Sequence, residues 1–155
     1  IFLKEAETLP PFENVSSALV SMSKTSDLMV VSAASSEGLV RDWSRAGLAE
    51  MADGIAGQEF GSKEMQLAHA LKNGYEPQKC MMIGDGLGDW KAAKENGICF
   101  YPIVPTREEF CWRELRDIYY PMFLKGEYAQ QAEEYLYQRF LTFLECGEKE
   151  DKNEY

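Results

Sequence analysis

The sequence predicts an α/β fold, in which a three-layer, Rossmann-like parallel sheet is covered by helices on both faces. Short apolar runs recur along the chain without alternating with polar residues, which is typical of strands buried on both faces. Most of these runs lead into a turn rich in glycine or serine and then a segment with helical periodicity. The 155 residues, 45% of them hydrophobic, are enough for one domain with its own core.

The first part of the chain is expected to contain a helix, a strand and a second helix. Residues 12–23 place apolar side chains at helical spacing. Residues 28–32 are predicted to form a strand, because an apolar run there ends at Ser32. The second helix is expected to begin near Ser36, a residue able to cap it, and to end at Gly47.

The middle of the chain repeats this alternation. The elements expected there are a weak strand at residues 54–56, a helix at 61–73, a strand at 79–84, a helix at 87–96 and a strand at 98–103. Strands separated by helices pair in parallel, so this order favours a parallel sheet.

Two further helices, at residues 106–120 and 127–145, are expected after the last strand, and both are rich in aromatic residues. Packing on the sheet is the simpler account of these aromatic residues, and a homodimer interface is the alternative. We divide the chain into a core at residues 12–103, a helical extension at 104–146 and a flexible acidic tail at 147–155.

The composition excludes several classes of protein. A net charge of -10 argues against binding to nucleic acid or to anionic membranes, both of which require a basic surface. We find no signal peptide and no apolar run of membrane-spanning length. The cysteines form no C-x-x-C motif, so reduced thiols in a cytoplasmic protein are expected; these are Cys80, Cys99, Cys111 and Cys146.

A glycine-rich turn at residues 83–89 places two carboxylates near the end of a predicted strand. Asp85 follows the strand and Asp89 lies in the first turn of the next helix. Two carboxylate ligands with room for water and substrate oxygens suit Mg²⁺. In the alternative interpretation, Asp89 only caps its helix and Asp85 only forms an Asx-type turn.

Ser32 and Lys63 are the other candidate site residues. Ser32 ends a predicted strand, where its hydroxyl and the following amides can bind an anion, although serine is also a common turn residue. Lys63 lies in the first turn of a helix, where the helix dipole disfavours a cation, so a functional role competes with that of a solvated surface lysine. His69 lies away from every motif and is assigned no role.

The order of these residues resembles that of the haloacid dehalogenase-like (HAD) hydrolase superfamily. Residues 28–32 are similar to its second motif, an apolar strand ending in Ser or Thr, and Lys63 is similar to its third. Residues 83–89 are similar to its fourth motif, G-D-x-x-x-D. Residues 10–15 resemble the segment that returns from the cap domain to the core, and the whole resemblance covers about residues 9–103.

The resemblance implies a Mg²⁺-dependent phosphatase that acts on a small phosphorylated metabolite through an aspartyl-phosphate. It implies that Ser32 would hydrogen-bond the phosphoryl group and Lys63 would balance its charge. It also implies that Asp85 and Asp89 would hold Mg²⁺, with Asp85 as the direct ligand. Phosphoryl transfer depends on positioning and on cations set against charged oxygens, which agrees with these roles.

The first motif of the family, an apolar strand followed by D-x-D, is missing from the sequence. We therefore expect residues 1–11 to be the tail of a cap or a linker. We also expect an upstream part of the same protein to supply the nucleophile and the strand between residues 28–32 and 81–84. The sheet would then be incomplete and this chain alone inactive. The alternatives are a non-catalytic HAD-like binding or regulatory module and, less favoured, a receiver-like domain.

Overall fold

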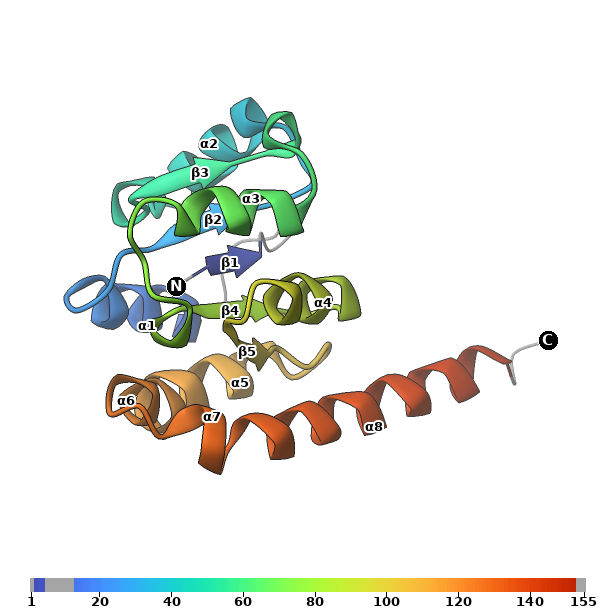
Figure 1. The fold of residues 1–155 in the computed structure, drawn as a ribbon. Helices are drawn as coiled ribbons and strands as arrows, with labels where there is room; N and C mark the ends of the chain where they lie inside the picture. Colours follow the sequence, from blue (N-terminus) through green and yellow to red (C-terminus); the bar gives the residue numbers. More distant parts are fainter. Residues whose placement is uncertain (1, 5–12, 153–155) are drawn as a thin grey trace.

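The computed structural model describes residues 2–4 and 13–152, and it shows a mixed α/β fold built on one parallel sheet (Figure 1). The strands occur in the spatial order β3-β2-β1-β4-β5. Their bounds are Phe2–Lys4 for β1, Met29–Val31 for β2, Gly54–Ala56 for β3, Met81–Gly84 for β4 and Cys99–Pro102 for β5.

Helices alternate with the strands and then continue to the end of the described chain. The first four helices are α1 (Glu13–Ser23), α2 (Ser36–Arg45), α3 (Lys63–Leu71) and α4 (Leu87–Glu95). The helices that follow β5 are α5 (Glu108–Glu114), a π-helical turn (Leu115–Tyr119), α6 (Tyr120–Leu124), α7 (Tyr128–Gln131) and α8 (Glu133–Lys152). Every strand and helix predicted for residues 12–103 is thus found in the predicted order.

The strand β1 corrects one prediction from the sequence. A gap is expected between β2 and β4, whereas β1 lies there and pairs in parallel with both. Residues 2–4 therefore belong to the sheet rather than to a linker, and the rest of the predicted linker falls mostly on residues 5–12, outside the described part. β2 and β4 each pair with β1, which agrees with the predicted order of these two strands.

The helices after β5 differ from the prediction in two places. The helix expected at residues 106–120 is interrupted by the π-helical turn, and Pro121 lies at the start of α6, where its missing N–H costs no hydrogen bond. The helix expected to end at residue 145 continues through Gly147 to Lys152. Glutamate and lysine, which favour helices, make up most of this added length.

The helices after β5 cover the edge of the sheet that this strand forms. Leu136 and Phe140 of α8 are fully buried, and the Tyr128 hydroxyl donates a hydrogen bond to the Phe100 carbonyl at 2.7 Å. Glu133 accepts a hydrogen bond from the Phe100 N–H and forms an ion pair with Lys94 of α4. Packing on the sheet therefore accounts for these buried aromatic residues. It also covers the edge strand β5, which could otherwise pair with a strand of another chain.

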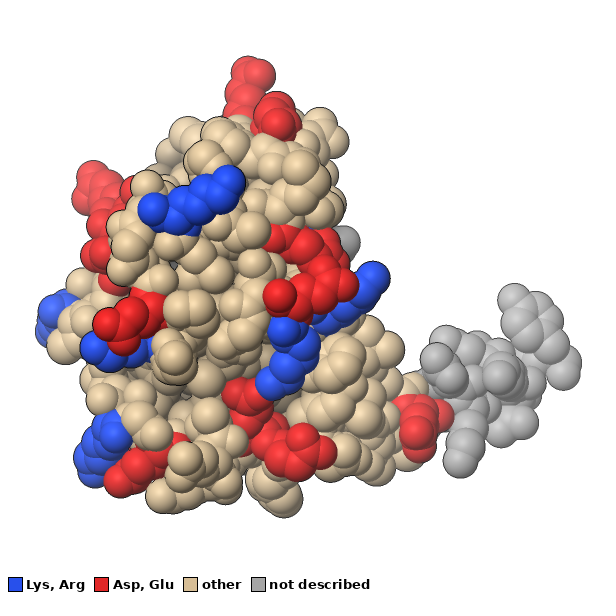
Figure 2. Space-filling model, in the orientation of Figure 1, with Lys and Arg blue, Asp and Glu red and all other residues tan. Residues whose placement is uncertain are grey.

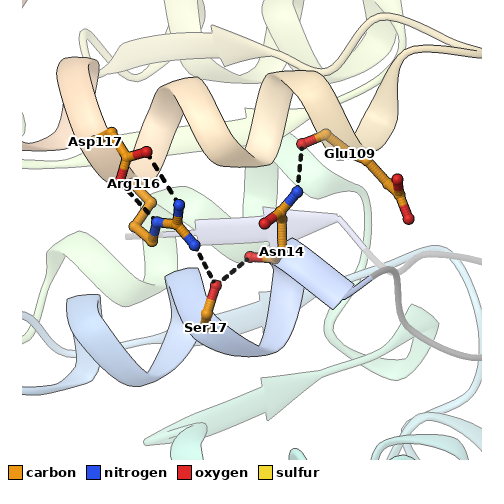
Figure 3. Close-up of polar contacts among 5 residues, drawn as sticks. All are labelled: Asn14, Ser17, Glu109, Arg116 and Asp117. Carbon is orange, nitrogen blue, oxygen red and sulfur yellow. Dashed lines mark hydrogen bonds and ion pairs between the residues drawn. The ribbon is translucent and has the colours of Figure 1, made fainter.

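Polar contacts join α1 to α5 and to the π-helical turn (Figure 3). The Asn14 side-chain amide donates to the Glu109 carbonyl at 3.2 Å, and Arg116 donates to the Ser17 hydroxyl at 2.8 Å. Arg116 also forms an ion pair with Asp117 at 2.7 Å. These groups are solvent-exposed, so they specify how the two helices meet more than they stabilise the fold.

The cysteines are all free thiols, as expected. Three of them are buried, and burial raises the pKa of the Cys99 thiol to about 12. On the face shown in Figure 2, lysine and arginine side chains lie beside aspartate and glutamate side chains. Within residues 2–4 and 13–152, no helix is long and apolar enough to cross a membrane.

Candidate functional site

Two of the predicted site residues, Ser32 and Asp85, follow the ends of parallel strands. Ser32 comes directly after β2, Gly57 after β3 and Asp85 after β4. Because these strands run in one direction within one sheet, the residues that follow them share its carboxyl edge. Ligands of open α/β sheets bind outside this edge, so it is the first place to look for a site.

Lys63 and Asp89 meet at this edge in an ion pair. The Lys63 Nζ lies 2.6 Å from Asp89 Oδ1, and the Asp89 side chain is completely buried while that of Lys63 is 18% exposed. The other oxygen, Oδ2, accepts a hydrogen bond from the Gly86 N–H at 3.1 Å. Both Asp89 oxygens are thus engaged by the protein, and a charged pair with little solvent around it interacts strongly.

Gly84 makes room for the buried carboxylate. A Cβ atom added to Gly84 would lie 2.5 Å from Asp89 Oδ2, well inside van der Waals contact. Asp89 can therefore pack against the end of β4 only because Gly84 has no side chain. The glycine before Asp85 is explained by this close approach.

Ser32 is held at the end of β2 by its backbone and its hydroxyl. Its N–H donates to the Ala56 carbonyl at 3.1 Å, and its Oγ accepts from the Ala34 N–H at 3.1 Å. The residue is only 6% exposed. Its hydroxyl thus lies at the turn after β2, at the carboxyl edge of the sheet.

The N-terminus of α2 already carries an anion. The Glu59 carboxylate accepts hydrogen bonds from the Ser36 N–H at 3.1 Å and from the Ser36 Oγ at 2.6 Å. Hydrogen bonds from the Ser36 side chain, more than any other cause, lower the pKa of Glu59. The N-cap itself is Ser35, one residue before the predicted Ser36, and its Oγ accepts from the Gly38 N–H.

Gln66 is a buried polar residue that the sequence analysis misses. Its Nε2 lies 2.9 Å from the Ser32 carbonyl, 3.0 Å from the Gly57 carbonyl and 3.0 Å from the Gly61 carbonyl. It is 1% exposed, and it lies one helical turn after Lys63 on α3. The signal in the sequence that points to Gln66 is its position on α3, because it lies on the buried side of this helix with Leu67 and other buried residues.

Asp85 is the exposed carboxylate of the site. It follows β4 and precedes Gly86, the N-cap of α4, so it lies at the carboxyl edge of the sheet and faces solvent. Among residues 2–4 and 13–152, no group of three or more His, Cys, Asp or Glu side chains is arranged to bind a metal. One accessible carboxylate nevertheless fits Mg²⁺, which keeps several waters and needs few protein ligands.

A cavity of about 630 Å³ lies at the opposite edge of the sheet. It is lined by residues 23–29 and by Asp53, Gly54, Tyr75 and Cys80, among others. The Tyr75 hydroxyl donates to Asp27 at 2.6 Å, and Asp53 accepts from the Leu28 N–H at 2.8 Å. The cavity is therefore separate from the four predicted site residues.

The comparisons with known proteins support the fold alone. No family model matches the sequence, and no curated protein matches it. One solved structure that resembles it is the NMR structure of a core domain from Streptococcus pneumoniae TIGR4, provisionally named a phosphoglycolate phosphatase. The likeness has a TM-score of 0.53 and 14% identity, and it covers 68% of this chain and 79% of that chain. The chain thus resembles that core domain in fold.

Proposed function

We propose that this chain carries part of the phosphoryl-transfer site of a HAD-type, Mg²⁺-dependent phosphohydrolase, on the three-layer, Rossmann-like core of that family. The substrate class is a small phosphorylated metabolite. The ion pair between Lys63 and Asp89 is the observation that carries the proposal. It sets a lysine ammonium at the carboxyl edge of a parallel sheet, close to the segment that holds Ser32.

Each residue has a proposed part in binding the phosphoryl group. The Ser32 hydroxyl donates a hydrogen bond to a phosphoryl oxygen, and the Lys63 ammonium balances its negative charge. Asp85 and Asp89 hold Mg²⁺, with Asp85 as the direct ligand because the Asp89 oxygens already accept from Lys63 and Gly86. When bound, Mg²⁺ neutralises charge on the phosphoryl oxygens.

In this proposal, the chain lacks one part of the phosphoryl-transfer site, the nucleophile. In the family it is an Asp after the central strand, whereas Glu5 follows β1 in this sequence. Glutamate is one methylene longer than aspartate, and in-line attack tolerates little misplacement of the nucleophile. We therefore expect no aspartyl-phosphate on this chain alone, and we propose that an upstream part of the same protein brings the nucleophile to this edge of the sheet, while β1 keeps its place between β2 and β4.

Binding of inorganic phosphate in the presence of Mg²⁺, measured by calorimetry on the chain alone, tests the proposal. We expect binding by the wild type and its loss in Ser32→Ala and Lys63→Ala. Ser44→Ala and Lys72→Ala are matched controls, because both residues are exposed and lie at the C-terminal ends of α2 and α3. The proposal is wrong if phosphate does not bind, or if the two site variants bind it as well as the controls do.

Turnover of p-nitrophenyl phosphate with Mg²⁺ tests the proposed inactivity. We expect none from the chain alone. Turnover that disappears in Asp85→Asn would show that a nucleophile is present after all. For a protein extended upstream of Ile1, we expect turnover, and we expect Lys63→Ala to abolish it.

A non-catalytic HAD-like binding or regulatory module is the second candidate. It is favoured by the Glu59 carboxylate, which occupies the first amide of α2 beside the Ser32 turn. Binding of phosphate without turnover in the extended protein would favour this module over the enzyme. A homodimer through the helices after β5 also remains a proposal, and the molar mass measured by light scattering tests it.

A further inference from the structure

Gln66 joins three separate backbone segments beneath the carboxyl edge of the sheet. The carbonyls that its Nε2 contacts belong to Ser32 at the end of β2, Gly57 at the end of β3 and Gly61 before α3. All three distances are 3.0 Å or shorter. A side-chain amide has two N–H donors, so these carbonyls share them.

The orientation of the Gln66 amide follows from these contacts. If the amide were reversed, Oε1 would face three carbonyl oxygens and no donor. Only the Nε2 end satisfies the carbonyls, each of which would otherwise be costly to bury. Oε1 is itself buried and accepts no hydrogen bond from any described residue.

The same turn of α3 carries Lys63. Gln66 is three residues after Lys63, so their side chains leave one face of the helix. Lys63 reaches Asp89 on α4, and Gln66 reaches the carbonyl of Ser32 after β2. α3 thus carries both the Lys63 ammonium and the amide that holds the Ser32 carbonyl.

We propose that Gln66 is a positioning residue that fixes the Ser32 turn relative to Lys63. It binds no ligand in this role and acts through the backbone of Ser32, Gly57 and Gly61. Its effect on phosphate binding rests on the proposed function, whereas its effect on the backbone does not. Two measurements, one on each effect, therefore keep the two proposals separate.

The first measurement is residue-resolved amide hydrogen exchange in Gln66→Met. Methionine has a similar volume but donates no hydrogen bond. We expect exchange at Ser32 and Gln58, whose N–H groups bond within these segments, to rise about tenfold, since several buried hydrogen bonds are lost. Exchange at Tyr101 in β5 should be unchanged, and Gln138→Met, at an exposed glutamine of α8, should match the wild type.

Several outcomes would overturn the proposal. A uniform rise in exchange that includes Tyr101 would reduce Gln66 to a general stabilising residue. Unchanged exchange at Ser32 would show that volume alone matters. In the wild type, rapid exchange of the Gln66 side-chain amide protons would contradict the three contacts without any variant.

The second measurement is the affinity for inorganic phosphate with Mg²⁺. We expect Gln66→Met to weaken it about tenfold while the protein remains folded. Gln66→Glu should weaken it further, because a carboxylate would face three carbonyl oxygens. Wild-type affinity in Gln66→Met would overturn the positioning role. Local loosening in Gln66→Met, with no phosphate bound by the wild type, would support the role of Gln66 and refute the proposed function.

Discussion

Lys63 and Asp89 are joined by an ion pair of 2.6 Å that connects the first residue of α3 to the first turn of α4. A lysine at a helix N-terminus is opposed by the helix dipole, and the Asp89 carboxylate offsets that cost. The pair also accounts for the buried Asp89, since an ionised carboxylate without a partner would be strongly destabilising there.

Asp89→Asn should destabilise the fold by about 3 kcal/mol, because it leaves the Lys63 ammonium in a partly buried position without its counter-charge. Urea unfolding followed by circular dichroism measures the loss. The double variant Lys63→Met with Asp89→Asn should recover part of it, because no charge is then left without a partner. Asp42→Asn, which affects a surface pair with Arg41, is the control and should change stability little. Equal effects of Asp89→Asn and Asp42→Asn would contradict the buried ion pair.

Gly84→Ala should destabilise the protein by about 1–3 kcal/mol, since its Cβ would overlap the Asp89 carboxylate. Gly88→Ala is the matched control, because an added Cβ there meets nothing within 4 Å. That control lies within α4 and should stabilise the helix by about 0.5–1 kcal/mol. The melting temperatures of the two variants should therefore move in opposite directions. A fall in both would show that the space beside Asp89 is not the cause.

The order of the elements could be predicted because its signals are local. Apolar runs and helical periodicity predict the strands and helices between α1 and β5 in their observed order. The strand β1 could not be predicted in the same way. Its three residues are too few to show a period, and its place depends on pairing with β2 and β4.

The candidate site could be predicted only in part, for a similar reason. Ser32, Lys63 and Asp89 stand at strand ends and helix starts, so their neighbourhood follows from the parallel order. Gln66 carries only the weak mark of its place on the buried face of α3, because its role depends on carbonyls up to 34 residues away. The sequence also predicts that the last helix ends before Gly147, because glycine commonly follows the end of a helix. In the structure α8 continues beyond it.

Glu59→Gln should change how stability depends on pH. Hydrogen bonds from Ser36 lower the pKa of Glu59, so the folded state favours the carboxylate over the protonated form. That contribution is present above the ordinary pKa of glutamate and is lost as the pH falls through the lowered folded value. The difference in unfolding midpoint between wild type and Glu59→Gln should be constant near neutral pH and shrink in acid. A difference that stays constant from pH 7 to pH 3 would contradict the assignment.

Tyr128→Phe should destabilise the protein by about 1–2 kcal/mol, because it removes the hydrogen bond to the Phe100 carbonyl and leaves that acceptor buried. Tyr135→Phe is the control, since Tyr135 is 62% exposed and should tolerate the change. Burial also raises the pKa of the Tyr128 phenol, so in an alkaline titration this tyrosine should ionise after the exposed ones. Urea unfolding and ultraviolet titration measure the two effects. If Tyr128→Phe and Tyr135→Phe were equally stable, the helices after β5 would not depend on this contact to cover the edge of the sheet.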